Sequence, residues 1–406
     1  ISPLEETPAQ RMGILAGDRI IEIEGKSTRR ITLEDAVKKL RGKPGTQVTI
    51  TVAREGVEEP LHFTMTREVI KLKAIPYYGM LKDRIGYVRL ANFSRTVGHE
   101  FKVAIDSLKA LRMEKLVLDL RGNTGGLLPE AVEISDCFLE EGKLIVSTKG
   151  RVQRADNDYY SAKPPTYSGP LVVLVDRGSA SASEIVAGAI QDYDKGLVLG
   201  TLTYGKGSVQ NLFPLDGGTA LKLTTARWYT PSGRCIDRGR EEEDRAAVTE
   251  EERPVPSDTF YTSGKRLVYG GGGITPDFEL ELPRLPVFVS KALGHLFQFA
   301  VSYTVAHKEI GQGFEVTPEM MKQFKNYLAK KEVTFTEEEF SEAEPLVKSY
   351  LKAEIAEKLW GTRGRYEVRL PDDPQVQKAI ELLSKAEKTE DIFAIAELEG
   401  KRESLK

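Results

Sequence analysis

Cysteine and histidine are scarce in this chain of 406 residues. Its two cysteines, Cys137 and Cys235, are too few for a disulfide framework, although they neither require nor exclude an oxidising compartment. The four histidines are scattered, and the sequence contains neither an HExxH nor a CxxC pattern. A zinc site is therefore not expected.

Strong net charge and long apolar runs are also missing. The 58 basic and 61 acidic side chains give a net charge of −3, so the clustered basic surface of a nucleic-acid-binding protein is not expected. The most apolar stretch, residues 285–306, carries Lys291, His295 and Gln298, and it predicts a packed amphipathic helix rather than a membrane span. Because the chain opens at Ile1 and not at a methionine, we expect that an upstream segment has been removed. The lack of a targeting sequence then does not indicate the cytoplasm.

What is present is an ordinary globular composition, and the length predicts two or three domains. The patterns divide the chain into three regions, residues 1–68, 69–284 and 285–406. In the first region, residues 48–52 alternate as a half-buried strand does. In the second, the apolar runs 116–120 and 171–175 predict buried parallel strands between helices, which indicates an α/β domain. The third region reads as helical and highly charged.

Capping residues predict where several helices begin. Thr32 predicts the start of a helix that reaches residue 40, and Asp373, directly before a proline, predicts another. Thr336 and Glu339 form a candidate capping box. Pro345 is expected to end or kink the helix that follows this box.

A serine-rich segment follows the second apolar run. Residues 178–185 read Gly-Ser-Ala-Ser-Ala-Ser-Glu-Ile and lead into a helix with apolar residues at i, i+3 and i+4 spacing. The small residues therefore lie at a strand-to-helix turn, where backbone N–H groups are unpaired and the helix dipole favours negative charge. A serine hydroxyl there could attack a carbonyl while nearby amides stabilise the oxyanion. The alternative is that Ser179 or Ser181 is only an N-cap.

Lys206 is the candidate base that such a serine requires. No histidine lies in a segment that resembles a triad partner. Glycines flank Lys206 on both sides, and the neighbouring apolar strands are expected to desolvate its amine, which favours the neutral form. Gln210, four residues on, shares a face with Lys206 on a helix or a strand and could orient it. The alternative is a surface lysine in a hairpin loop.

Lys206 also fits part of a phosphate-binding P-loop, together with Gly200 and Gly205. However, Gly207 stands where magnesium binding needs serine or threonine, and a strand-like run follows in place of a helix. Nucleotide hydrolysis is therefore rejected.

A third element is the glycine-rich turn within residues 118–127, Leu-Asp-Leu-Arg-Gly-Asn-Thr-Gly-Gly-Leu, which ends a strand before a helix. Such a turn can present a free N–H group into a cleft. Alone it is a weak signal, since most strand–glycine–helix connections are only turns.

Together these stretches resemble the carboxyl-terminal processing peptidases, also called tail-specific proteases. The matching stretches are residues 118–127, 178–185 and 204–210, with further similar stretches at 230–234 and 272–277. The resemblance implies an α/β (α+β multidomain) architecture: a PDZ domain, a crotonase/ClpP-like protease core and a helical C-terminal region. It implies that Ser181 is the nucleophile, Lys206 the general base and Gln210 the glutamine that supports the base. It also implies that the backbone amides of Gly126 and Ala182 form the oxyanion hole. It implies no metal or organic cofactor.

Residues 2–23 resemble a PDZ domain, a fold that captures extended chain ends by adding a strand to a sheet edge. The first PDZ strand and its carboxylate-binding loop are expected upstream of Ile1, so no carboxylate-binding residue is assigned. Residues 238–273, rich in glycine and charge, are longer than the family pattern. They are predicted to be a solvated loop or insertion that does not contact Ser181 or Lys206.

The resemblance thus predicts a serine endopeptidase that cleaves proteins near their C-termini with help from its PDZ domain. It implies protein or peptide substrates, no nucleic acid, homodimerisation through the helical region, and an extracytoplasmic site (periplasm, cell envelope or lumen) that includes peripheral membrane association. Two alternatives remain: an inert PDZ-containing scaffold and a crotonase-like acyl-transfer enzyme. The intact Ser181, Lys206 and Gln210 argue against the first, and the PDZ-like segment argues against the second.

Overall fold

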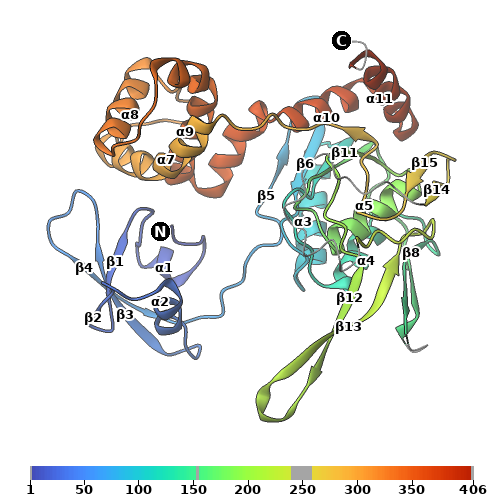
Figure 1. Cartoon of the computed structure of the whole chain (residues 1–406), viewed down its shortest axis with the longest axis horizontal. Helices are drawn as coiled ribbons and strands as arrows, with labels where there is room; N and C mark the ends of the chain where they lie inside the picture. Colours follow the sequence, from blue (N-terminus) through green and yellow to red (C-terminus); the bar gives the residue numbers. More distant parts are fainter. Residues whose placement is uncertain (1, 152–154, 239–257, 404–406) are drawn as a thin grey trace. The chain divides into compact units, whose positions relative to one another are not determined.

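A computed structural model describes residues 2–151, 155–238 and 258–403 (Figure 1). The chain forms two compact units, and each unit combines two separate stretches of sequence. The first unit comprises residues 1–72 and 283–372, and the second comprises residues 73–282 and 373–406. The third region expected from the sequence, residues 285–406, is therefore divided between the two units.

The N-terminal part of the first unit is a four-stranded antiparallel sheet in the order β2-β1-β3-β4. Its elements are α1 (Pro8–Arg11), β1 (Arg19–Ile23), β2 (Lys26–Ser27), α2 (Leu33–Leu40), β3 (Gln47–Ala53) and β4 (Leu61–Thr66). Thr32 caps α2 as predicted, because its hydroxyl accepts the backbone N–H of Asp35 at 3.1 Å. The alternating apolar residues Val48, Ile50 and Val52 of β3 are all buried.

The remainder of the first unit is helical. Its elements are α7 (Val287–Ala306), α8 (Pro318–Lys330), α9 (Glu337–Arg369) and a 3₁₀ turn, η4 (Leu370–Asp372). The capping box forms at the start of α9, where the backbone N–H of Glu339 donates to the Thr336 hydroxyl and the Thr336 N–H donates to the Glu339 carboxylate. None of the helices within the described ranges combines the length and the apolarity needed to span a bilayer.

Pro345, which was expected to end or kink its helix, does not end it. Helix α9 continues through Pro345, and its non-helical residue is Gly361, which has a φ of 68°. A proline inside a helix costs about 3 kcal/mol, because one backbone hydrogen bond is lost. Val347 and Leu351, which follow Pro345 in the same helix, are buried in the helical core and offset that cost.

The second unit is built on a six-stranded sheet in the order β16-β11-β10-β7-β6-β5. Its strands are β5 (Tyr77–Met80), β6 (Ile85–Arg89), β7 (Lys115–Asp119), β10 (Leu171–Val175), β11 (Leu197–Gly200) and β16 (Phe278–Glu279). All neighbours pair in parallel except β5 and β6. All five residues of β10 are buried, as expected for a strand covered on both faces.

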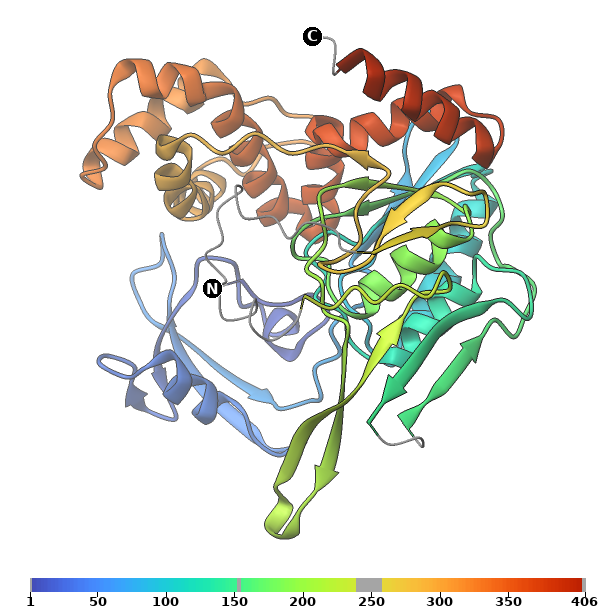
Figure 2. The same cartoon turned by 45° about the vertical axis from the view of Figure 1, so that its right-hand side comes forward.

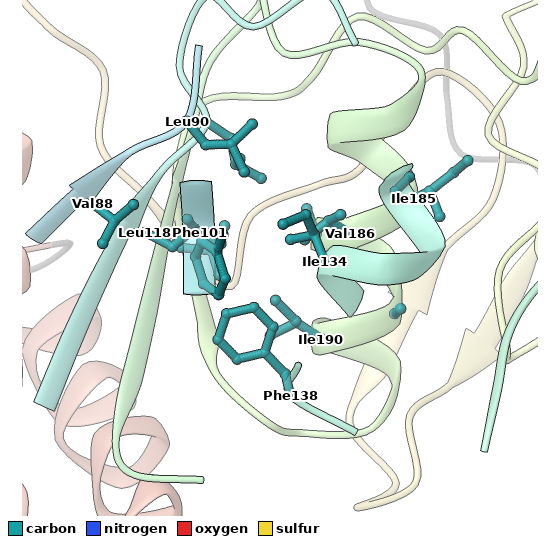
Figure 3. Packing of buried hydrophobic residues seen from close by; sticks show 14 of the residues in the cluster. Val88, Leu90, Phe101, Leu118, Ile134, Phe138, Ile185, Val186 and Ile190 are labelled. Atoms are coloured by element: carbon teal, nitrogen blue, oxygen red, sulfur yellow. The ribbon is translucent and has the colours of Figure 1, made fainter. Parts of the chain in front are cut away.

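Five helices of the described residues pack with this sheet: α3 (Val97–Ala110), α4 (Leu128–Asp136), α5 (Ala182–Asp192), α10 (Pro374–Lys385) and α11 (Thr389–Glu403). Figure 3 shows Phe101 of α3, Ile134 of α4 and Val186 of α5 meeting Leu118 of β7 in one apolar core. Helix α10 contacts β7, β10 and β11, which explains why the end of the chain belongs to this unit.

A second sheet, in the order β12-β13-β8-β9, carries a long hairpin (Figure 2). Its strands are β8 (Leu144–Gly150), β9 (Asn157–Tyr160), β12 (Ser208–Pro214) and β13 (Ala220–Tyr229), and the 3₁₀ turn η2 (Asp216–Gly218) joins the last two. Residues 238–273, predicted to be a solvated loop or insertion, are not a solvated loop throughout, and residues 239–257 lie outside the described residues. Strands β14 (Thr259–Tyr261) and β15 (Leu267–Tyr269) form a hairpin, which Val268 anchors by being buried.

Candidate active site

Two loops meet at the carboxyl ends of neighbouring strands. Strand β7 leads into the glycine-rich turn before α4, and β10 leads into the serine-rich turn before α5. Because β7 and β10 pair in parallel, their following loops lie at the same edge of the sheet. The backbone N–H of Ala180 donates to the carbonyl of Asn123 at 3.0 Å, and the N–H of Gly122 donates to the Asp176 carboxylate at 2.6 Å.

Ser179 and Ser181 have different environments. Ser179 is fully buried, and its hydroxyl donates to the carbonyl of Leu120 at 2.9 Å while it accepts the N–H of Asp176 at 3.0 Å. Ser181 is half-buried at the N-cap of α5. The geometry therefore favours Ser181 as the hydroxyl that a substrate can reach and gives Ser179 a structural role.

The backbone of Ser181 is strained. Its φ of 55° and ψ of −112° lie in a region that residues other than glycine rarely occupy, at a cost of about 1–3 kcal/mol. The strain is held by a hydrogen bond of 2.7 Å from the Ser181 N–H to the carboxylate of Glu184. Strain of this kind is concentrated at functional sites, where it presents a side chain in a fixed direction.

The glycine-rich turn lies directly against Ser181. A Cβ atom on Gly125, which has a φ of 98°, would lie 2.9 Å from the backbone N of Ala182 and 2.9 Å from the Cβ of Ser181. Only glycine fits at this position. Within the described ranges, the N–H groups of Gly126 and Ala182 have no hydrogen-bond partner. The free N–H of Ala182, the residue after Ser181, and the free N–H of Gly126, in the adjoining glycine-rich turn, are donors of the kind that an oxyanion hole requires.

Glu184 joins the serine turn to the Lys206 loop, a role that the sequence analysis missed. Its buried carboxylate accepts the Thr203 hydroxyl at 2.5 Å and the backbone N–H groups of Ser181, Gly205 and Lys206 at 2.7, 2.7 and 2.9 Å. Burial raises the pKa of Glu184, and the four donors oppose that rise. The available signal was the Ser-x-x-Glu spacing of a capping box.

One oxygen of Glu184 accepts both the Ser181 and the Lys206 N–H, so these two backbones lie within two hydrogen-bond lengths of each other. Lys206 is half-buried, and its carbonyl accepts the indole N–H of Trp228 at 3.0 Å. No hydrogen bond joins the Lys206 amine to Ser181 or to Gln210 among the described residues. The structure thus brings the Lys206 backbone to the serine turn and leaves its side chain unpaired with either residue.

Gln210 does not share a regular strand with Lys206. Its side chain is exposed on β12, opposite Thr224, and a bulge between Val209 and Gln210 interrupts the strand. Lys206 itself precedes β12. The rule that residues i and i+4 of a strand share a face therefore does not apply to this pair.

A buried cluster of charges supports the glycine-rich turn. Asp119, the last residue of β7, accepts the Tyr87 hydroxyl at 2.6 Å and the Arg121 guanidinium at 2.6 Å. Burial alone would raise the pKa of Asp119, but the charges of Arg121 and Arg89 and their hydrogen bonds lower it to about 2. The guanidinium of Arg121 also forms an ion pair of 2.9 Å with the carboxylate of Asp373, the N-cap of α10. These contacts connect helix α10 to the start of the glycine-rich turn.

Metal ligands and reactive thiols do not contribute to this geometry. No group of three or more His, Cys, Asp or Glu side chains able to hold a metal occurs in the part of the chain that the structure describes. Cys137 and Cys235 are free thiols. Burial raises the pKa of Cys137 to about 11, which disfavours the nucleophilic thiolate.

Comparisons with known proteins match three segments of the chain. Residues 84–245 match peptidase family S41, residues 2–54 match the PDZ domain, and residues 296–361 match a family of unknown function.

Several known proteins are similar to this chain. The carboxy-terminal-processing protease of Bartonella bacilliformis is 45% identical over 242 residues, which cover 58% of this chain and 55% of that protein. The carboxyl-terminal-processing protease of Synechocystis sp. is 34% identical over 283 residues, which cover 68% of this chain and 65% of that protein. A solved photosystem II D1 C-terminal processing protease is 27% identical, with a TM-score of 0.40. The match covers 69% of this chain and 67% of that protein. The chain spans between about half and two thirds of the length of the curated relatives it matches.

Proposed function

We propose that the protein is a serine endopeptidase that cleaves polypeptides near their C-termini, because residues 84–245 match peptidase family S41. The observation that carries the proposal is the strained Ser181 turn beside two unpaired backbone donors. Ser181 is the nucleophile and Lys206 the general base. None of the four histidines lies in the segments that build the site, so lysine is the base that the site offers.

The mechanism follows from these positions. Lys206, as a neutral amine, takes the hydroxyl proton of Ser181 while the Ser181 oxygen bonds to the scissile carbonyl carbon. The carbonyl electron pair moves to its oxygen, which the N–H groups of Gly126 and Ala182 stabilise. When the tetrahedral intermediate collapses, the Lys206 ammonium returns the proton to the leaving amine. Water then hydrolyses the ester on Ser181. Each oxyanion donor contributes about 10²–10³ in kcat in sites of this kind.

The PDZ domain is proposed to select substrates by their chain ends. Residues 2–54 match that domain, which captures extended peptides at an apolar groove and a sheet edge. The first unit holds a cavity of about 570 Å³ whose lining is mainly apolar and includes Ile14, Ile20, Val37 and Leu40. A cavity of that size accommodates apolar side chains of a bound segment.

An inert peptide-binding scaffold is the second candidate function. The exposure of the Gln210 side chain, together with the lack of a hydrogen bond between the Lys206 amine and Ser181 in the described chain, favours it. Such a protein would bind chain ends through the PDZ domain and would not cleave them.

Cleavage of an unstructured protein with a free C-terminus tests both candidates. We expect the parent chain to cleave this substrate. The variants Ser181→Ala and Lys206→Ala should each lower kcat by a factor of at least about 10³. The matched controls are Ser168→Ala and Lys102→Ala, two exposed residues of the same unit, which should retain full activity. Amidation of the substrate's C-terminus should raise KM if the PDZ domain selects chain ends. Binding of the substrate without any cleavage by the parent would establish the scaffold instead.

A further inference from the structure

A two-stranded arm projects from the second unit close to Lys206. The arm consists of β12 and the part of β13 that pairs with it, residues 220–227. Figures 1 and 2 both show it extending away from the sheets of this unit. Strand β12 begins at Ser208, two residues after Lys206. The arm is therefore a direct continuation of the candidate active site.

One face of the arm is apolar and exposed. Phe213 lies opposite Leu221 and Asn211 lies opposite Leu223, so Phe213, Leu221 and Leu223 share a face of the hairpin. Their exposed fractions are 41, 44 and 45%. A two-stranded hairpin has no second layer to cover such side chains and is only marginally stable alone in water. A contiguous exposed apolar cluster of this kind marks an interaction surface.

The outer edge of β12 is open. In the described part of the sheet β12-β13-β8-β9, β12 is a terminal strand and pairs with β13 alone. Alternate N–H and C=O groups of such a strand point outward and can accept another strand. Charged side chains, one of the devices that protect open edges, are absent from Ser208 to Pro214, so the edge between the bulge at Gln210 and Pro214 remains open to pairing.

We propose that an extended segment of the polypeptide substrate pairs with the open edge of β12 and places its apolar side chains beside Phe213, on the face that Leu221 and Leu223 continue. The inference rests on the proposed function. Backbone pairing tolerates many sequences, and alternate side chains supply the selectivity. The seven residues of β12 span about 24 Å. The arm therefore contacts substrate residues well away from the scissile bond.

A second copy of this chain fits the arm less well. A stable protein interface engages about 20–30 residues on each side, and β12 with its partners on β13 provides fewer. A substrate segment has no such requirement, because the active site of the same unit supplies further contacts.

The test compares long and short substrates with the arm altered. The variant Phe213→Ser/Leu221→Ser removes the cross-strand apolar pair, and Leu111→Ser/Val103→Ser removes two exposed apolar side chains of the same unit as a control. We expect the arm variant to lower kcat/KM for an unstructured protein by about 10-fold or more. Cleavage of a tetrapeptide ester, too short to reach the arm, should stay within about 2-fold. An unchanged kcat/KM on the protein, or an equal loss on both substrates, would overturn the proposal.

Binding separates this proposal from the proposed function. In a Ser181→Ala background, we expect the arm variant to weaken binding of the same unstructured protein by about 10-fold in calorimetry, whether or not the parent chain cleaves it. Equal affinity with and without the arm substitutions would refute the arm's role even if cleavage is confirmed. If the arm variant converts an oligomer to a monomer in light scattering and affects both substrates alike, the arm joins copies of the chain and the proposal is wrong.

Discussion

Glu184→Gln tests how the serine turn and the Lys206 loop are held together. Glutamine has the shape of glutamate, but one of its two terminal groups is an NH₂, which donates and does not accept. Four donors converge on the buried carboxylate: the Thr203 hydroxyl and the Gly205 N–H on one oxygen, and the Ser181 and Lys206 N–H groups on the other. The glutamine amide can therefore satisfy only one of these two pairs.

The favoured orientation of the glutamine follows from the partners. Thr203 can rotate its hydroxyl and accept from the new NH₂, whereas a backbone N–H cannot. The amide oxygen therefore stays on Ser181 and Lys206, and the N–H of Gly205 loses its acceptor. A buried donor without an acceptor costs about 1–3 kcal/mol. We expect Glu184→Gln to lower the free energy of unfolding by that amount. We expect kcat to fall by about 10-fold, because Gly205 directly precedes Lys206, the proposed base.

Fluorescence of Trp228 provides the stability assay. The chain has two tryptophans, and a Trp360→Phe background leaves Trp228, whose indole N–H donates to the Lys206 carbonyl. Urea unfolding then reports on the affected loop. The control is Glu114→Gln, which alters an exposed glutamate of the same unit and should change stability by no more than about 0.5 kcal/mol. If Glu184→Gln behaves like this control in both stability and kcat, Glu184 does not hold the two loops together.

Three further predictions concern the turn and its support. The pKa of Asp119 is lowered from 3.8 to about 2, so its ionisation contributes about 2–3 kcal/mol to the free energy of unfolding. That contribution is present above pH 3.8 and is lost as the pH falls through 2. Urea unfolding from pH 6 to pH 2 should show this loss in the parent and not in Asp119→Asn. Gly125→Ala should reduce kcat by at least about 10-fold, because its Cβ would lie 2.7 Å from the Ala180 carbonyl; Gly142→Ala, which shares a positive φ but has open space around it, should leave kcat unchanged. Asp373→Ser keeps an N-cap acceptor for α10 and loses the contact with Arg121, whereas Asp373→Ala loses both. Calorimetry should show Asp373→Ala less stable than Asp373→Ser by about 1 kcal/mol, and both variants should lower kcat equally; an unchanged kcat in both would contradict a role for the Arg121 contact.

The sequence by itself determined the local elements, because their causes lie within a few residues. The buried run Leu171–Val175 is strand β10, and the helix after the serine turn is α5. Thr32 and Asp373 cap the helices that they were predicted to begin. The glycine-rich turn and the serine turn could also be expected at one edge of a parallel sheet, because strand–turn–helix units place their turns there.

Tertiary structure alone decided how distant segments combine. Helix α9 passes through Pro345 because burial of later residues outweighs the lost hydrogen bond, an energy that no local pattern shows. The assignment of α10 to the α/β unit depends on contacts with strands some 200 residues earlier in the chain. Glu184 reads as a helix-capping residue in the sequence, and only the fold brings Thr203, Gly205 and the Lys206 backbone to its carboxylate. Spacing sets which residues can share a face, but burial and long-range pairing determine which of them meet.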